Sequence, residues 1–173
     1  MQTPLLTRLA ARDRELLIRW ALDERSAHAL RNLLVAITHA GGVWASMALA
    51  SLPLLGTNRL ARAGWKPMAA LLISHAVVQL FKRTVGRRRP SCAVRARSAI
   101  ADPDRFSFPS GHAAASMSIA VVYAALFPTL TVPLILGATA VGLTRVLLGV
   151  HYPGDVIASQ LIAAATALAV LAR

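Results

Sequence analysis

The sequence predicts an all-α fold: a polytopic membrane helical bundle of about five transmembrane helices, preceded by an N-terminal amphipathic helix. Composition is the first observation, because only 15% of the 173 residues are charged, whereas a soluble domain averages about 25%. The mean hydropathy is correspondingly high, at +0.57. The third observation is that residues 32–58, 106–144 and 156–172 contain no Asp, Glu, Lys or Arg. Charge-free runs near or above about 20 residues predict membrane spans.

The length is that of one domain, and we expect residues 1–173 to form a single membrane-embedded unit. Residues 1–31 are its amphipathic N-terminal segment, and residues 32–173 are its transmembrane bundle. Within residues 4–31, leucines and Trp20 are interleaved with arginines and acids, as in a helix that lies in the headgroup region. A cytosolic packing or dimerising element is the alternative. Residues 8–31 lack the apolar core that a signal peptide has.

The first two membrane helices are expected at about 33–55 and 65–85. Near the start of the first, Gly41 and Gly42 favour close helix contact, and His39 is interpreted as a packed or interfacial residue that alternatively lines the mouth of a site. In the second, His75, Gln79 and Lys82 fall at i, i+4 and i+7 and share one face. Polar groups at membrane depth either face a wet cavity or join helices by hydrogen bonds, and both interpretations stay open for His75 and Gln79.

Three further spans are expected at about 111–127, 132–150 and 154–172, because Pro128 and Pro133 interrupt the longest charge-free run. The helix at 111–127 is short, about 25 Å against a hydrocarbon core of about 30 Å. Its N-terminus should therefore sit slightly below the membrane surface.

The start of that short helix has the features of an anion site. Pro109 disfavours helix for Phe108, and Ser110 is a good N-cap. The free N–H groups of Gly111 and His112 would then point at one place, where the helix dipole favours an anion. His112 adds a titratable imidazole beside it.

Five antiparallel spans bring four helix ends to one side of the membrane: the end of 65–85, the start of 111–127, the end of 132–150 and the start of 154–172. This convergence gathers Lys82, Arg89, Ser110, Gly111, His112, Arg145, His151 and Asp155. The cations and the helix N-terminus suit the charge of a phosphoryl group in transfer. One imidazole oriented by a carboxylate can attack phosphorus, while the other protonates the departing oxygen.

The remaining charges suggest neither a metal nor a nucleic acid. Asp102 and Asp104 lie in a cationic loop at 87–105 without a nearby histidine or further carboxylate, so we interpret them as a turn rather than a metal site. We expect no cofactor. The net charge of +12 is assigned to topology, anionic headgroups or a phosphate substrate, because the sequence shows no nucleic-acid-binding motif. The single cysteine, Cys92, cannot form an internal disulfide.

The combination Lys82-x6-Arg89-Pro90, Pro109-Ser110-Gly111-His112 and Arg145-x5-His151-x3-Asp155 resembles the signature of the type 2 phosphatidic acid phosphatase (PAP2) superfamily. The resemblance covers residues 82–155. It departs from the family pattern at Thr144, where Ser is usual, and in having five spans rather than six.

This resemblance implies a role for each matched position. His151 would be the nucleophile that forms a phosphohistidine, Asp155 would orient its ring, and His112 would be the general acid. The phosphate oxygens would be held by Lys82, Arg89, Ser110, the Gly111 N–H and Arg145. It also implies hydrolysis without a metal and inhibition by vanadate.

The residue pattern and the resemblance together lead us to expect an integral membrane lipid phosphatase that removes a terminal phosphate. Its substrate would be phosphatidylglycerol phosphate, phosphatidate, a polyprenyl-phosphoryl pentose phosphate or undecaprenyl diphosphate. A non-enzymatic membrane protein that binds lipid phosphates and a vanadium haloperoxidase-like enzyme are the alternatives. The sequence does not indicate an oligomeric state.

The arginines near the N-terminus bear on which side of the membrane the site faces. They are Arg8, Arg12, Arg14, Arg19, Arg25 and Arg31. With five spans they share the side of the site, and the positive-inside rule then favours a cytoplasm-facing site in a bacterial inner membrane.

Overall fold

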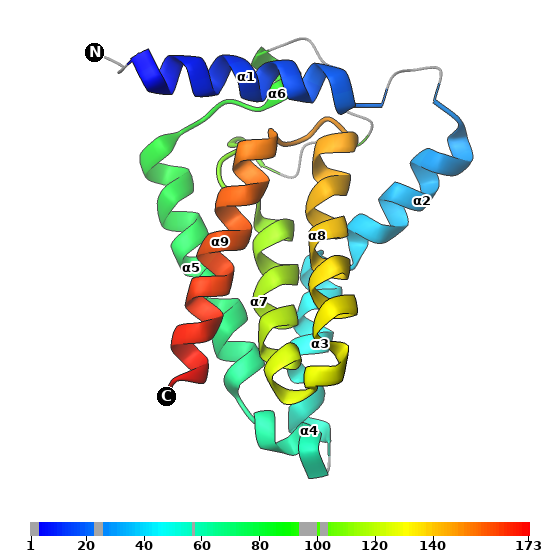
Figure 1. Ribbon diagram of the computed structural model, residues 1–173, viewed down its shortest axis with the longest axis vertical. Coiled ribbons are helices and arrows are strands. Elements are labelled where there is room, and N and C mark those ends of the chain that lie inside the picture. The colour runs from blue at the N-terminus through cyan, green and yellow to red at the C-terminus, as the bar shows by residue number, and fades with distance from the viewer. Residues whose placement is uncertain (1–3, 23–25, 57, 94–99, 101–103) are drawn as a thin grey trace.

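The structure is a computed structural model that describes residues 4–22, 26–56, 58–93, 100 and 104–173. Its regular elements in this part of the chain are helical, and Figure 1 shows them as an upright bundle capped by one crosswise helix. They are α1 (Pro4–Trp20), α2 (His28–His39), α3 (Val43–Leu55), α4 (Asn58–Ala63), α5 (Lys66–Val85), α6 (Pro90–Ala93), α7 (Gly111–Leu126), the 3₁₀ turn η1 (Pro128–Leu130), α8 (Thr131–Leu147) and α9 (Pro153–Leu171). The predicted all-α membrane bundle is confirmed.

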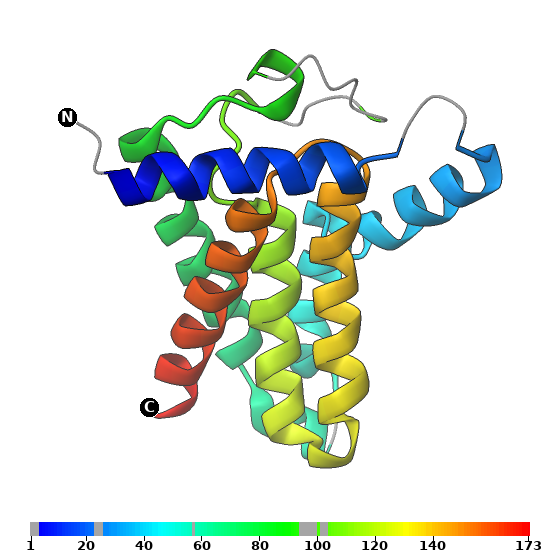
Figure 2. The same cartoon turned by 45° about the horizontal axis from the view of Figure 1, so that its top comes forward.

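The amphipathic helix α1 is shorter than predicted. It ends at Trp20, and residues 28–31 belong instead to α2, so the expectation of one helix over 4–31 was wrong. In Figures 1 and 2, α1 lies across the ends of α8 and α9. Leu17 fixes it there, because this side chain is fully buried with Ala113, Val146, Tyr152 and Val156. One apolar side of α1 thus packs against the helix bundle.

The first predicted span is broken. Instead of one helix over 33–55, α2 and α3 meet at an angle of 43°, with Gly41 and Gly42 between them. Close packing explains why small residues stand at this break: a Cβ on Gly41 would lie 2.7 Å from the carbonyl oxygen of His112 and 2.7 Å from Val141 Cγ1. The bend therefore brings the chain against the start of α7.

The other predicted spans match α5, α7, α8 and α9 to within a few residues. Among the described residues, α5, α8 and α9 are long and apolar enough to cross a membrane, the α2–α3 pair passes the same test as a bent span, and α7 is a shorter apolar helix. The protein is an integral membrane protein.

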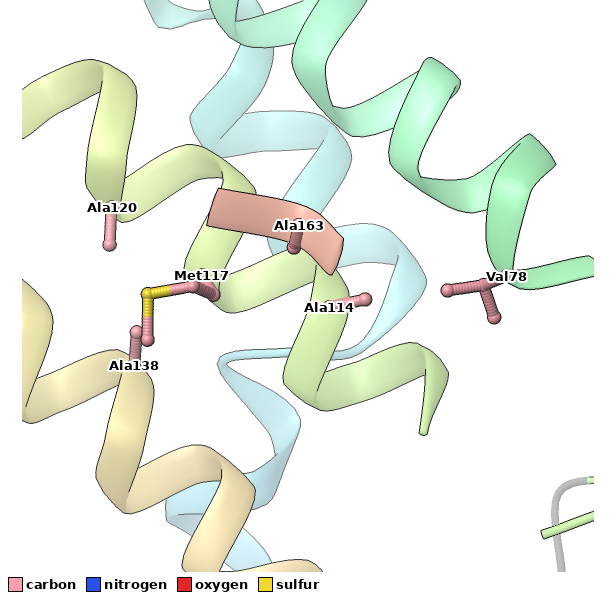
Figure 3. Packing of buried hydrophobic residues seen from close by; sticks show 6 residues of the cluster. All are labelled: Val78, Ala114, Met117, Ala120, Ala138 and Ala163. Carbon is pink, nitrogen blue, oxygen red and sulfur yellow. The ribbon is translucent and has the colours of Figure 1, made fainter. Parts of the chain in front are cut away.

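The short helix α7 forms the centre of the bundle. Its Ala114, Met117 and Ala120 pack against Val78 of α5, Ala138 of α8 and Ala163 of α9 (Figure 3). Most of these side chains are alanine, which lets the helix backbones approach closely, as membrane helices require in the absence of a hydrophobic force between them. The candidate site lies at the start of this central helix.

Candidate active site

The predicted site residues lie at the end of the bundle that α1 covers. Left-handed glycines stop two of the converging helices there: Gly86 has φ 59° after α5, and Gly149 has φ 74° after α8. A cavity of about 380 Å³ opens in this layer, and its lining includes Lys82, Arg89, Gly111, His112 and His151. The remaining three, Ser110, Arg145 and Asp155, are buried in the same layer with exposed fractions of 0–1%.

The surroundings of His151 fix which ring nitrogen carries the proton and which carries the lone pair. Its Nδ1 lies 2.6 Å from the backbone carbonyl oxygen of Ser107. Because a carbonyl only accepts hydrogen bonds, Nδ1 carries the proton and the neutral ring keeps its lone pair on Nε2. Nε2 accepts a hydrogen bond from Nη1 of Arg89 at 3.2 Å, a contact that a bound phosphate would have to replace before Nε2 could attack.

The protonation state of His151 suits a nucleophile. Burial lowers the pKa of this imidazole to about 4; Arg89 and Arg145 act in the same direction, and Asp155 opposes them. The ring is therefore neutral at physiological pH. Asp155 Oδ2 lies 3.7 Å from Nδ1, beyond hydrogen-bond distance, so Ser107 rather than Asp155 makes the ring's hydrogen bond in this structure.

The Asp155 carboxylate is instead fixed by Arg87 and by the backbone. Its Oδ1 accepts from Arg87 Nη1 at 2.7 Å, and its Oδ2 accepts from the Tyr152 N–H at 3.0 Å. Arg87 also pairs with Asp13 of α1 at 2.7 Å and lies 3.9 Å from the centre of the Tyr152 ring. Burial works against the charge of Arg87, but Asp155 and Asp13 outweigh it and raise the pKa.

Asp13 makes a second contact at the start of α9. Its Oδ1 accepts a hydrogen bond from the Gly154 N–H at 2.7 Å. A Cβ on Gly154 would come within 2.9 Å of Oδ2, so the close approach needs glycine. The surface helix α1 is thereby connected to the residues beside His151.

Two of the predicted phosphate ligands hold a carboxylate. Lys82 Nζ lies 2.8 Å from Asp104 Oδ2, and Arg89 Nη2 lies 2.9 Å from Oδ1. Burial acts against the charge on Asp104, but hydrogen bonds and attraction from Lys82 and Arg89 lower its pKa below the usual range. The arrangement can hold a compact anion between two cations beside His151.

The start of α7 adds N–H groups and a hydroxyl. Ser110 stands at the predicted N-cap position, but its hydroxyl makes no capping hydrogen bond; its Oγ is buried with no partner among the described residues. A Cβ on Gly111 would meet no atom within 4 Å, so nothing crowds this helix end. The Ser110 hydroxyl and the free N–H groups at the start of α7 are therefore available as hydrogen-bond donors to an anion.

His112 and Arg145 are the last two of the eight predicted site residues. His112 lines the cavity, and its Nε2 would lie 3.8 Å from a Cβ on Gly42, so the α2–α3 break runs beside it. Arg145 donates from Nη1 to the Thr38 hydroxyl at 2.9 Å. The neighbouring Thr144, where the family pattern has Ser, donates its own hydroxyl to the Val141 carbonyl at 2.7 Å.

The family model of the PAP2 superfamily matches residues 63–173. The chain belongs to this superfamily. Decaprenylphosphoryl-5-phosphoribose phosphatase from Mycolicibacterium smegmatis is 35% identical over 127 residues, which cover 70% of this chain and 67% of that protein. Lipid A 1-phosphatase from Rhizobium johnstonii is 37% identical over 93 residues, which cover 51% of this chain and 38% of the relative. The chain thus spans about two thirds of the first relative and well under half of the second.

Solved PAP2 structures share the fold. Aquifex aeolicus LpxE superposes with a TM-score of 0.79 over 92% of this chain and 94% of that one, at 21% identity. The Bacillus subtilis PAP2-type phosphatidylglycerolphosphate phosphatase gives a TM-score of 0.72 over 95% of this chain and 85% of that one, also at 21% identity.

Several residues of the candidate site were not predicted from the sequence. Arg87 was counted only as part of a cationic loop, and Asp104 only as part of a turn; Asp102 lies outside the described residues. Ser107 acts through its backbone, for which no side-chain pattern exists, and Asp13 and Thr38 come from distant helices. Within the described ranges, no group of three or more His, Cys, Asp or Glu side chains is placed to hold a metal.

Proposed function

We propose that this chain is a lipid phosphatase that hydrolyses a terminal phosphate through a phosphohistidine on His151, without a metal. The observation that carries the proposal is the hydrogen bond from Nδ1 to the Ser107 carbonyl at 2.6 Å. It leaves the Nε2 lone pair of a neutral imidazole beside Lys82 and Arg89, where an anionic phosphate would be held.

In the first step, Nε2 forms a bond to phosphorus as the bond from phosphorus to the leaving oxygen breaks. For this step His112 must hold a second proton, which the negative charge of the bound phosphate favours. It gives that proton to the leaving oxygen, and the lipid alcohol departs. The phosphorylated His151 ring carries a positive charge, which the Ser107 carbonyl and the Asp155 carboxylate at 3.7 Å stabilise.

In the second step, a water molecule attacks the phosphohistidine and breaks its bond to Nε2. His112 takes a proton from this water, and inorganic phosphate leaves. In both steps, the charge that develops on the phosphoryl oxygens faces Lys82, Arg89, Arg145, the Ser110 hydroxyl and the Gly111 N–H.

The substrate class is a membrane lipid phosphate: phosphatidylglycerol phosphate, phosphatidate, a polyprenyl-phosphoryl pentose phosphate or undecaprenyl diphosphate. The names of the relatives support a lipid substrate. A cytoplasm-facing site in a bacterial inner membrane is supported by α1, which lies on the side of the site and carries Arg8, Arg12, Arg14 and Arg19.

A phosphate-release assay across these lipids, in detergent with a chelator present, tests the proposal. We expect release by the wild-type protein, and loss of release by at least three orders of magnitude in His151→Ala. His28→Ala is the matched control, because His28 is an exposed histidine on α2. Release that depends on added metal, or that survives in His151→Ala, would contradict the proposal.

A further inference from the structure

The catalytic cavity extends well beyond the phosphate layer. Besides the site residues, its lining includes Leu71 and Leu72 of α5, Val43 and Met47 of α3, and Ala115 of α7. Leu71 is eleven residues before Lys82 on one helix, which corresponds to about 16 Å along the axis. The cavity therefore follows α5 from the charged layer towards the hydrocarbon interior, along the path that a lipid substrate would take.

Three polar side chains line this otherwise apolar part: Ser46 of α3, and His75 and Gln79 of α5. Gln79 and His75 stand about 4.5 and 10.5 Å along the helix axis from Lys82. They lie at depths that the link between the phosphate and the hydrocarbon chain of a bound lipid would reach.

Ser46 is the clearest sign that a ligand group belongs here. Its side chain is 1% exposed, and its Oγ has no hydrogen-bond partner among the described residues. A serine in a membrane helix usually bonds back to a carbonyl of its own helix, as Ser51 does to the Met47 carbonyl at 2.8 Å. Leaving a buried hydroxyl unpaired costs about 1–3 kcal/mol, and a polar ligand group would remove that cost.

His75 and Gln79 offer further donors. The Gln79 amide nitrogen lies 3.3 Å from His75 Nε2. An amide NH₂ only donates, so Nε2 accepts and Nδ1 of His75 carries the proton. The pair therefore keeps an imidazole N–H, a second amide N–H and an amide oxygen for a ligand.

We propose that Ser46, His75 and Gln79 form a second polar subsite, which binds the hydrogen-bonding group that links the cleaved phosphate to the hydrocarbon chain. The ligand class is a sugar, a polyol or the phosphodiester next to it. The chain would then select lipid phosphates in which the phosphate is carried on such a linker. A phosphate joined directly to a hydrocarbon chain places only methylene groups against these donors, which stay unpaired. This inference rests on the proposed phosphatase function and narrows its substrate.

The test compares two substrates in mixed micelles. Phosphatidylglycerol phosphate carries its terminal phosphate on a glycerol joined through a phosphodiester, and farnesyl phosphate carries it directly on a hydrocarbon chain. The variants are Ser46→Ala and Gln79→Leu. Ser51→Ala is the matched control, because it removes a hydroxyl from the same helix that is already satisfied within that helix.

We expect each subsite variant to lower kcat/KM for phosphatidylglycerol phosphate about tenfold, mainly through KM, which corresponds to the loss of one hydrogen bond. The value for farnesyl phosphate should change less than twofold, and Ser51→Ala should change neither. Activity on farnesyl phosphate also reports that the variants are folded.

Equal losses on both substrates, no loss on either, or a wild-type protein that cleaves only farnesyl phosphate would overturn the subsite while leaving the phosphatase assignment intact. Release from neither substrate by the wild-type protein would contradict the proposed function, and the subsite with it.

Discussion

Two carboxylates flank the candidate site at His151, and their surroundings differ sharply. Asp155 is fully buried, and its two oxygens accept from Arg87 at 2.7 Å and from the Tyr152 N–H at 3.0 Å. Asp104 is 44% exposed and pairs with Lys82 and Arg89 at 2.8 and 2.9 Å. Asp155 is thus enclosed by the protein beside His151, whereas Asp104 pairs with the two cations that line the cavity.

This difference implies that Asp155 keeps its contacts when substrate binds, whereas Asp104 can be displaced by the phosphate. Asp155 contacts groups that a substrate does not reach, so its charge is present in every state of the reaction. Asp104 binds the side chains that we expect to hold the phosphate, and it must give up at least part of these contacts when a phosphate binds. The buried carboxylate should therefore affect turnover, and the exposed one should affect binding.

Replacing the buried carboxylate should have the largest effect. Asp155→Asn keeps the shape but removes the charge that stabilises phosphorylated His151. Two opposite charges about 4 Å apart attract by about 4 kcal/mol at an effective dielectric constant of about 20, so we expect kcat to fall about 10³-fold. KM should change only a few-fold. Steady-state kinetics on the best lipid substrate would measure both, and a variant that keeps a tenth of the wild-type kcat would contradict a catalytic role for this charge.

Replacing Arg87 should cause the second largest loss of kcat, because Arg87 positions Asp155 but is not among the residues expected to hold the phosphate. Arg87→Ala removes the pairs with both Asp155 and Asp13, and we expect kcat to fall about 10–100-fold. Asp13→Asn should cost less, and the double variant should lose less than the sum of the two losses in free energy. Fully additive losses would show that α1 does not act through Arg87.

The pH dependence tests the state of His151 itself. An imidazole with an ordinary pKa of about 6.5 would be only about one tenth neutral at pH 5.5, whereas burial holds the pKa of His151 at about 4. The lowered pKa means that the folded protein binds fewer protons than the unfolded chain between these values. The contribution to the free energy of unfolding is thus complete above pH 6.5 and is lost as the pH falls through 4.

An NMR titration of labelled histidines in micelles, with His151→Ala to assign the signal, would measure this pKa. We expect His151 to stay neutral at pH 5.5. A titration midpoint near 6.5 would contradict it.

Replacing Asp104 should have the smallest effect, and it should strengthen rather than weaken the binding of substrate. Asp104→Asn removes the competitor for Lys82 and Arg89, so we expect KM and the inhibition constant of vanadate to fall a few-fold with kcat little changed. Inhibition curves for wild type and variant would measure this. A large loss of kcat would mean instead that Asp104 positions the two cations.

The contrast also marks what the sequence could and could not predict. The fold class and four of the spans followed from charge-free runs and prolines, because a bilayer imposes span length. The break at Gly41–Gly42 did not follow, because it depends on the close approach of His112 from a distant helix. Lys82, Arg89 and His151 could be predicted because antiparallel spans bring their helix ends to one side of the membrane and because their spacing resembles the PAP2 signature.

The missed residues were of another kind. Arg87 looked like any loop arginine until the fold placed it between Asp13 and Asp155. Ser107 contributes a backbone carbonyl, which side-chain chemistry does not predict. Asp104 acts through pairing with cations that are 15 and 22 residues away in the chain, which no local pattern indicates.

Trapping the covalent intermediate would show directly whether His151 is the nucleophile. The wild-type protein would be mixed with a phosphate-labelled lipid, quenched in alkali, where phosphohistidine survives, and digested for mass spectrometry. We expect the label on His151 in the presence of chelator, and no label on the His151→Ala variant. A label on any other residue, or lipid turnover by a protein in which His151 is never phosphorylated, would contradict it.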